Sequence, residues 1–123
     1  TDNNGQSSSL LEPALHVLQY PRIKFNSKEI VKITKLDTFI EHKENFNFLN
    51  IDVQGYELEV LKGGARFLES IDYIMTEVNN AEVYKNCARI EELDKFLGET
   101  YNFKRVETFW AGVTWGDAFY VKQ

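Results

Sequence analysis

Residues 51–63, with the sequence IDVQGYELEVLKG, decide the fold of this chain. An apolar run ends on the carboxylate of Asp52, the chain turns at Gly55, and Leu58 and Leu61 then recur at helical spacing. In an open α/β sheet, such a junction of strand and helix is where ligands bind. The stretch therefore predicts an α/β fold with a site beside Asp52.

The composition limits the classes of protein to consider. The chain has 123 residues, of which 43% are hydrophobic, which suits one domain with a core. Its net charge of −5 and the lack of a basic cluster give no reason to expect a nucleic-acid partner. Cys87 is the only cysteine, so we expect a reducing, cytoplasmic setting. No apolar run approaches the roughly 18 residues of a membrane span, so no membrane partner is expected.

The first part of the chain carries turn and breaker residues. Asn4-Gly5 is a turn signal, and Pro13 and Pro21 interrupt regular structure. We therefore predict a mostly irregular N-terminal arm over 1–28 and place the α/β part at 29–123. Within that part, residues 30–33 are rich in β-branched side chains and predict a short strand, and residues 34–37 have the form of a helix capping box.

The remaining pattern alternates strands and helices. Apolar residues predict strands over 46–53, covered on both faces, and 71–78; helical spacing predicts helices over 58–68 and, beyond a loop, around 90–97. Gly63 and Gly64 mark either a break or a close packing point in the first helix. Two closing strands, 103–109 and 118–121, complete the pattern. It predicts a mostly parallel sheet with an antiparallel C-terminal edge hairpin.

Several strings of the sequence resemble one family. They are KLDTFI, NFLNIDVQGYELEVLKGG, YIMTEVN followed by VYKN, and WGDAFYV, together with the opening NNGQSSSL. In this order they are similar to the FkbM-type S-adenosylmethionine-dependent methyltransferases, over nearly the whole chain. The resemblance implies a Rossmann-like fold whose last strand is antiparallel.

The same resemblance shows what this sequence does not carry. The family holds its cofactor with a glycine-rich loop after the first strand and an acidic residue after the second, and the seven glycines of this chain include no G-x-G. We therefore expect the C-terminal part of a methyltransferase domain, without its N-terminal strands, or a shortened relative. Binding of S-adenosylmethionine by this chain alone is expected to be weak or absent.

Two carboxylates are the predicted catalytic residues. Asp52 ends the most buried strand, and Glu77 ends the neighbouring one, so the two side chains are expected to face each other across the mouth of the sheet. Two close carboxylates raise one pKa and create a candidate base. The alternatives are that Asp52 caps the helix near Tyr56 and that Glu77 is a paired structural acid.

The predicted cofactor-binding residues are Asp52, Gln54, Gly55 and Ser8. Gln54 is a neutral amide, which orients a ligand or binds backbone but cannot serve as a base. Gly55 lets the chain pass close to a ligand, or simply makes a tight turn. Ser8 belongs to the serine-bearing stretch, for which a plain polar arm is the alternative.

The predicted substrate-binding residues are Glu57, Asn79, Trp115 and Asp117. Glu57 lies in the first helical turn, where the helix dipole alone favours an acid. Asn79 follows Glu77, and Trp115 and Asp117 would form a wall on the substrate side or a packed hairpin. No metal site is predicted, because the two histidines have no ligand partners at useful spacing.

Two functions remain open. The first is methyl transfer from S-adenosylmethionine to an oxygen of a small-molecule or sugar acceptor, as the resemblance implies. The second is a non-catalytic α/β module for binding or assembly, which the absence of the glycine-rich loop favours. Because the strand at 46–53 would have a bare edge, we expect a homo-oligomer, the missing N-terminal half, or coverage by 1–28 or 30–33.

Overall fold

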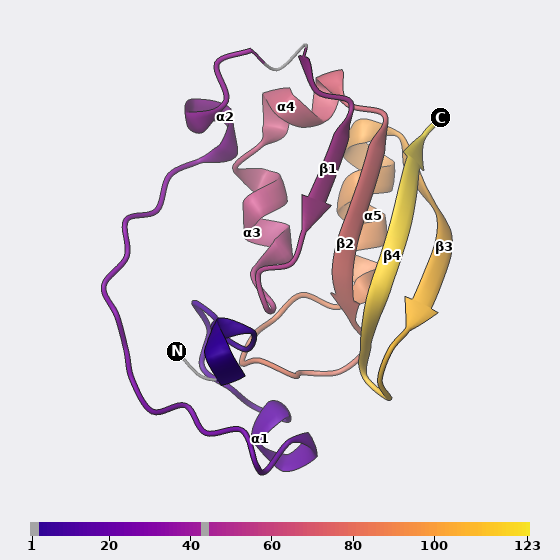
Figure 1. Cartoon of the computed structure of the whole chain (residues 1–123). Helices are drawn as coiled ribbons and strands as arrows, with labels where there is room; N and C mark the ends of the chain where they lie inside the picture. The colour runs from indigo at the N-terminus through magenta and orange to yellow at the C-terminus, as the bar shows by residue number, and fades with distance from the viewer. Residues whose placement is uncertain (1–2, 43–44) are drawn as a thin grey trace.

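The computed structural model describes residues 3–42 and 45–123, which form a four-stranded sheet with helices on one face (Figure 1). The elements in chain order are η1 (Asn3–Gly5), α1 (His16–Gln19), α2 (Leu36–Phe39), β1 (Phe48–Ile51), α3 (Glu57–Lys62), α4 (Ala65–Ser70), β2 (Tyr73–Asn79), α5 (Ile90–Tyr101), β3 (Phe103–Trp110) and β4 (Trp115–Lys122). The predicted α/β class is confirmed.

The strands are ordered β1-β2-β4-β3 across the sheet. β1 and β2 are parallel, whereas β4 is antiparallel to both β2 and β3. The predicted C-terminal hairpin is therefore confirmed, and it forms one edge of the sheet. The sheet as described is mixed, not mostly parallel, because β4 inserts beside β2 and contributes two antiparallel pairings. No strand of the described chain pairs with the outer edge of β1.

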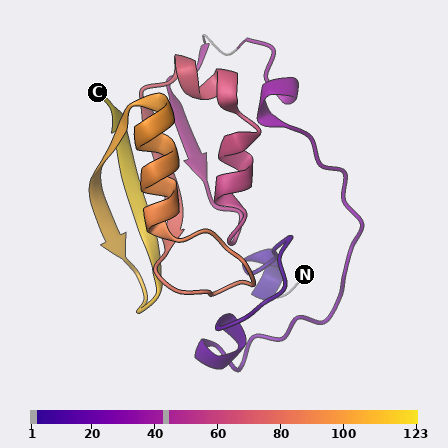
Figure 2. The same cartoon turned by 180° about the vertical axis from the view of Figure 1, so that it is seen from behind.

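The two faces of the sheet differ in what covers them. Side chains alternate along a strand, and those of Ile51, Ile74 and Tyr120 point to the rear face, where they are at most 3% exposed. Helices α3, α4 and α5 contribute Leu61, Leu68, Leu93 and other residues to the same core (Figure 2). No helix of the described residues covers the front face.

The front face exposes aromatic side chains. Phe48, Tyr73 and Phe109 are 49%, 39% and 60% exposed, and the ring of Tyr73 stacks on Phe119 at 6.1 Å between centroids. The prediction that β1 is covered on both faces is therefore wrong. Its apolar composition reflected one packed face and one bare aromatic face.

The first predicted helix is broken into α3 and α4 at Gly63-Gly64. Both alternatives for the glycines hold, because a Cβ on Gly64 would lie 2.9 Å from Leu36 Cδ2. The predicted capping box at 34–37 is wrong: α2 starts after Lys35 without a side-chain cap. Instead, the carboxylate of Asp37 accepts hydrogen bonds from the backbone N–H groups of Arg66 (2.9 Å) and Phe67 (2.9 Å), at the start of α4.

Helix α5 follows the predicted pattern, with Ile90, Leu93 and Leu97 buried against the sheet. Its start is fixed by the carboxylate of Glu92, which accepts a hydrogen bond from the backbone N–H of Arg89 at 2.8 Å. Among residues 3–42 and 45–123, no helix has the length and apolar character needed to cross a bilayer.

The N-terminal arm docks on the loop that follows β2. Pro13 forms an isolated antiparallel β-bridge with Tyr84. The backbone N–H groups of Ala14 and His16 donate to the carbonyl of Val83, and further main-chain hydrogen bonds extend this contact. The arm therefore lies across the carboxyl end of the sheet and not along the edge of β1. The predicted strand at 30–33 is wrong, because this segment is an extended connection, in which Ile30 is fully exposed.

Candidate functional site

The turn between β1 and α3 is built around a buried acid. Gln54 and Gly55 both have positive φ, at 53° and 99°, and a Cβ on Gly55 would lie 3.0 Å from Cys87 Cβ. The side chain of Glu57 is 1% exposed, and its Oε1 accepts the N–H groups of Val53 (3.2 Å) and Gly55 (3.0 Å). Glu57 thus holds the turn in shape.

Asp52 and Glu77 lie together at the carboxyl ends of the two parallel strands. The amide Nε2 of Gln54 donates to Asp52 Oδ1 at 2.7 Å and to Glu77 Oε2 at 3.0 Å. Tyr84 Oη in turn donates to Gln54 Oε1 at 2.8 Å. The alternative that Asp52 caps α3 is wrong, because that helix has no side-chain cap. The structure thus brings the two predicted carboxylates into one hydrogen-bonded network.

This crowding changes the proton affinity of the acids. Burial, with the nearby charges of Glu57, Asp52 and Asp117, raises the pKa of Glu77 to about 8. Burial also raises the pKa of Glu57 and, together with the charge of Asp52, that of Asp117. At neutral pH Glu77 therefore retains its proton, and the site favours ligands that carry positive charge or hydroxyl donors.

The carboxyl oxygens of Asp52, Glu57 and Glu77 lie within 4.8 Å of one another, close enough to hold a metal ion. Sequence spacing did not predict this cluster. Its oxygens already accept N–H groups from Gln54 and from the turn. The cluster by itself therefore assigns no metal to the site.

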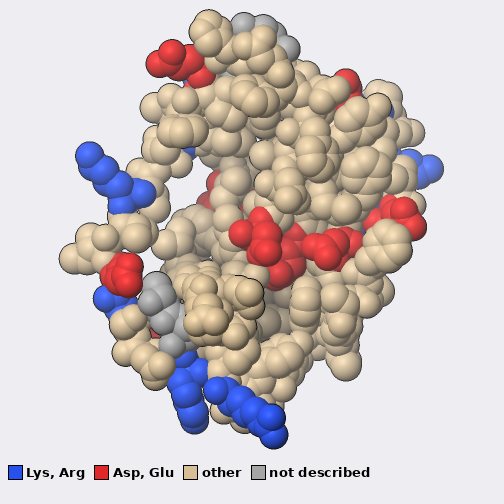
Figure 3. Space-filling model, viewed as in Figure 1, with Lys and Arg blue, Asp and Glu red and all other residues tan. Residues whose placement is uncertain are grey.

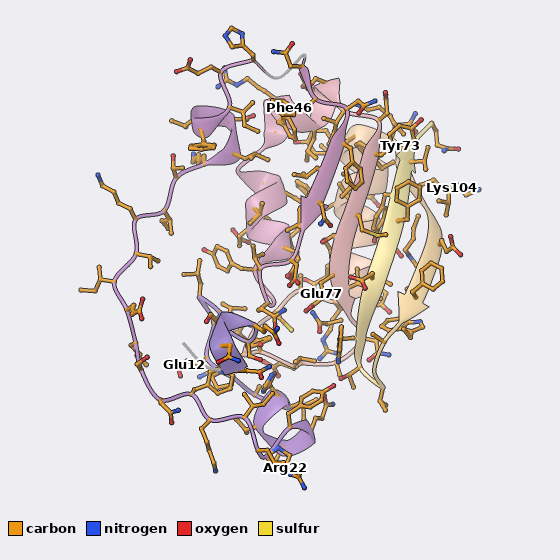
Figure 4. All side chains as sticks on the ribbon, in the orientation of Figure 1. Glu12, Arg22, Phe46, Tyr73, Glu77 and Lys104 are labelled. Carbon is orange, nitrogen blue, oxygen red and sulfur yellow. The ribbon has the colours of Figure 1, made fainter. Side chains whose placement is uncertain are left out.

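Two pockets meet at Asp52, which lines both. The outer pocket, about 760 Å³, lies between β1 and the arm and is also lined by Ser8 and Lys28. The inner pocket, about 410 Å³, lies between the arm and the ends of β1, β2 and β4 and is also lined by Glu77 and Trp115. In Figure 4 the Glu77 side chain lies at the end of β2 that faces the arm, and Phe46 and Tyr73 lie toward the other end.

Of the other predicted residues, Ser8 lines the outer pocket and Trp115 the inner one, whereas Glu57, Asn79 and Asp117 line neither. Ser8 Oγ is buried at the outer pocket without a hydrogen-bond partner. Trp115 Nε1 donates to Tyr20 Oη at 2.7 Å. Asp117 pairs with Glu77 across the sheet, and Asn79, 1% exposed, pairs with Trp115. Both polar atoms of the Asn79 side chain are buried without a partner.

The sequence did not point to most of the inner-pocket lining, and among the residues it did not identify are three with hydrogen-bonding rings, His16, Tyr20 and Tyr84. Tyr84 belongs to the string VYKN, which carried the resemblance but was given no role. His16 and Tyr20 reach the site only because the arm folds back over the loop after β2. No spacing in the sequence signals that contact.

The sequence is similar to a known family and to two curated methyltransferases. Residues 1–105 match the family model described as the methyltransferase FkbM domain. The chain is 30% identical over 81 residues to the 2-O-methyltransferase NoeI of Sinorhizobium fredii. This aligned region covers 64% of this chain and 33% of NoeI. It is 32% identical over 66 residues to the hexuronic acid methyltransferase AglP of Haloferax volcanii. This aligned region covers 54% of this chain and 28% of AglP.

The chain thus spans about a third of the length of these curated relatives. No solved structure matches it. The matched region contains Asp52, Gln54 and Glu77, so the carboxylate network lies within the part that the family model describes.

Proposed function

Since the chain belongs to the FkbM methyltransferase family, we propose that its site takes part in methyl transfer from S-adenosylmethionine to a hydroxyl oxygen of a sugar or secondary metabolite. The strand order β1-β2-β4-β3, with β4 antiparallel, supports a Rossmann-like sheet of which these strands are one half. The single cysteine favours a cytoplasmic location, which stays a prediction.

One observation carries the proposal: Asp52 lines both the outer and the inner pocket. Methyl transfer needs a donor site and an acceptor site that meet, because the reacting atoms must be held in line. We assign the donor to the outer pocket and the acceptor to the inner pocket. Asp52 then stands where the methyl group would pass.

The outer pocket fits part of the donor. S-adenosylmethionine supplies a methyl group on a positively charged sulfur, and the Asp52 carboxylate suits that charge. The orphaned Ser8 Oγ provides an unused hydrogen-bonding group at the same pocket. The chain has no G-x-G turn to hold the rest of the donor. The residues present thus fit part of the molecule, and weak binding is expected.

The acceptor hydroxyl loses its proton as the new C–O bond forms, so a base is needed. Glu77 retains its own proton up to about pH 8, which leaves Asp52 as the base that we propose. Gln54 holds both carboxyl groups through its amide and acts as a positioning residue. Tyr84 fixes the orientation of Gln54 by donating to its Oε1.

The names of the relatives indicate the acceptor class. NoeI is named a 2-O-methyltransferase and AglP a hexuronic acid methyltransferase. An oxygen of a sugar is therefore the acceptor that we propose for this chain.

A second function stays open, a non-catalytic module for binding or assembly. It is favoured by the absence of a G-x-G turn and by the bare aromatic front face, which exposes Phe48, Tyr73 and Phe109. A module that only docks against another protein would use that face and would not need the carboxylate network.

Titration of S-adenosylmethionine into the chain, followed by NMR of the backbone amides, separates the two functions. We expect amide shifts at Asp52–Gly55 and at Ser8, and an affinity at least tenfold lower in Asp52→Asn. Glu107→Gln on the exposed side of β3 is the control and should bind as the wild type does. A Kd near 1 µM corresponds to a binding free energy of about 8 kcal/mol. This is more than we expect from a chain without the glycine-rich turn. If no amide shifts appear at S-adenosylmethionine concentrations up to several millimolar, the binding free energy is weaker than on the order of 4 kcal/mol. That result would favour the non-catalytic module.

A further inference from the structure

The inner pocket contains a buried histidine that no step above uses. His16 lies on α1 and is 5% exposed, and its Nδ1 has no hydrogen-bond partner. The same residue lines the pocket that Asp52, Gln54 and Glu77 close from the sheet side. A buried polar atom without a partner costs on the order of 1–3 kcal/mol, so a ligand group that pairs with Nδ1 would recover part of this free energy.

The position of His16 is fixed, as a binding residue requires. Its N–H donates to Val83 O at 3.1 Å, and its carbonyl accepts from Tyr20 N at 2.9 Å. Its ring lies 5.2–5.4 Å, between centroids, from the rings of Tyr20, Phe25 and Tyr84. The imidazole is therefore held by the main chain and by aromatic packing, while Nδ1 has no hydrogen-bond partner among the described residues.

Burial lowers the pKa of His16, which keeps the ring neutral near pH 7. A neutral imidazole offers one donor and one acceptor nitrogen. A hydroxyl both donates and accepts, so it can pair with Nδ1 in either tautomer. An alcohol group of a ligand is thus the natural partner of this atom.

The charge of the pocket narrows the ligand further. Its described lining includes the acids Asp52 and Glu77 and contains no lysine or arginine. In Figure 3 one group of acidic side chains lies in the middle of the face shown, and the basic side chains, with some further acidic ones, lie toward its periphery. Because Glu77 is protonated at neutral pH, a carboxylate or phosphate brought into this pocket would meet the negative charge of Asp52 without a cation to offset it.

The shape and the aromatic lining suit a sugar ring. A volume of about 410 Å³ falls within the roughly 300–1,000 Å³ typical of small-molecule sites. Tyr20, Tyr84 and Trp115 line the pocket and provide apolar ring surface, and the carboxyl and amide groups provide hydrogen-bond partners. An amino group on the ring would add a favourable pairing with the Asp52 carboxylate.

We propose that the inner pocket binds a neutral or amino-bearing sugar ring, with a ring hydroxyl hydrogen-bonded to His16 Nδ1, and that it discriminates against uronic acids and sugar phosphates. This inference rests on the proposed function for the reason that a sugar is bound there. It goes beyond that function by naming His16 and by assigning the selectivity to charge.

The test titrates D-glucosamine, methyl glucoside and D-glucuronate separately into the whole chain at equal ionic strength, without methyl donor. Binding is followed by tryptophan fluorescence and by the imidazole nitrogen resonances. Glucosamine and methyl glucoside should move the His16 signals and bind at least tenfold more tightly than glucuronate. Equal binding of glucuronate, or no change at His16 with any sugar, overturns the proposal.

Substitution of the histidine separates a binding role from a structural one. His16→Phe keeps the aromatic packing and removes the unpartnered nitrogen, so its melting temperature should equal or exceed that of the wild type. Its affinity for glucosamine should fall at least tenfold. Leu18→Phe, at an exposed position of the same helix, is the control and should change neither quantity. Wild-type affinity in His16→Phe overturns the role of His16.

A gain of function tests the charge argument. Gln6 is exposed at the rim of the inner pocket, so Gln6→Lys places a cation there with little risk to folding. Glucuronate binding should increase at least fivefold and glucosamine binding should decrease. An unchanged ratio would show that charge does not set the selectivity.

The outcome is distinguishable from failure of the proposed function. Shifts with S-adenosylmethionine but none with sugars would sink only this inference. Sugar binding with the expected selectivity but no donor binding would leave the inner pocket as a sugar site and count against methyl transfer.

Discussion

The rear and front faces of the sheet are made from the same strands but behave differently. Ile74 on the rear is fully buried, whereas the adjacent Tyr73 on the front is 39% exposed. Helices α3, α4 and α5 cover the rear and supply the core. On the front face the aromatic side chains are exposed. The N-terminal arm contacts this face near the carboxyl ends of β1 and β2.

The difference indicates a division of labour within one sheet. The rear face stabilises the fold, because burial of apolar area is the main favourable term in folding. On the front face, near the carboxyl end of β2, Glu77 is only 7% exposed although it is an acid. Burying such a group costs stability, which agrees with the role in the site that we propose for the acids. The predictions below test this division.

The largest effect is expected in the rear core. Ile74→Ala should lower the free energy of unfolding by about 4 kcal/mol, because it removes buried methyl groups and leaves a cavity. Tyr73→Ala, one residue away on the front face, should cost less than about 1 kcal/mol. Urea denaturation of both variants measures the contrast. Equal losses would mean that the front face is also packed in solution.

The next effect concerns the buried acid at the carboxyl end. The folded pKa of Glu77, about 8, lies above its ordinary value, so the folded state binds the proton more tightly. Stability is then greatest below about pH 4.5 and falls as pH rises toward 8. Between pH 5 and 8.5 the wild type should lose roughly 3 kcal/mol relative to Glu77→Gln.

Denaturation at the two pH values measures that loss. Both proteins retain Glu57, whose raised pKa acts in the same direction, so the difference between them isolates Glu77. Glu107→Gln serves as the exposed control. Parallel pH profiles for wild type and Glu77→Gln would contradict the burial of this acid.

A smaller effect is expected at the turn that carries Gln54. Gly55→Ala should cost about 2 kcal/mol, because the residue has positive φ and its Cβ would crowd Cys87. Gly5→Ala is the matched control: it has positive φ, but nothing lies within 4 Å of its Cβ. It should cost about 1 kcal/mol. A Gly55→Ala loss no larger than this control would show that the turn is not tightly packed.

The smallest effect on stability is expected on the bare front face. Phe48→Ser and Phe109→Ser together should change the free energy of unfolding by less than about 1 kcal/mol, because both rings are half exposed or more. They should reduce the self-association that an exposed aromatic face favours. Light scattering over a range of concentrations measures this. A wild-type chain that stays monomeric throughout would contradict the predicted homo-oligomer.

Local patterns predicted most of the regular structure. The helical spacing of Ile90, Leu93 and Leu97 identified α5, and the apolar run before Glu77 identified β2. The strand predicted at 30–33 was wrong, because residues with β propensity do not form a strand unless a neighbouring strand is available for pairing. Asp37 was expected in a capping box at the start of α2, but it caps α4 instead. That contact joins residues about thirty apart and depends on how the helices pack.

The site was predicted in the same uneven way. Asp52 and Glu77 could be placed together, because carboxyl ends of parallel strands meet at one edge of a sheet. Their link through the Gln54 amide could not, since it depends on a turn with two successive positive φ values. His16 was set aside because its sequence neighbours offered no partner, and the docking of the arm gave it neighbours from the far side of the chain.

The sequence by itself determined the family resemblance, the alternation of strands and helices and the two carboxylates at strand ends, because these follow from local periodicity and from residue identity. The tertiary structure alone decided which face of the sheet is bare, how the arm closes the inner pocket and that Glu77 holds its proton near neutral pH. These properties depend on burial and on charges brought together from distant segments, and neither is encoded in the spacing of neighbouring residues.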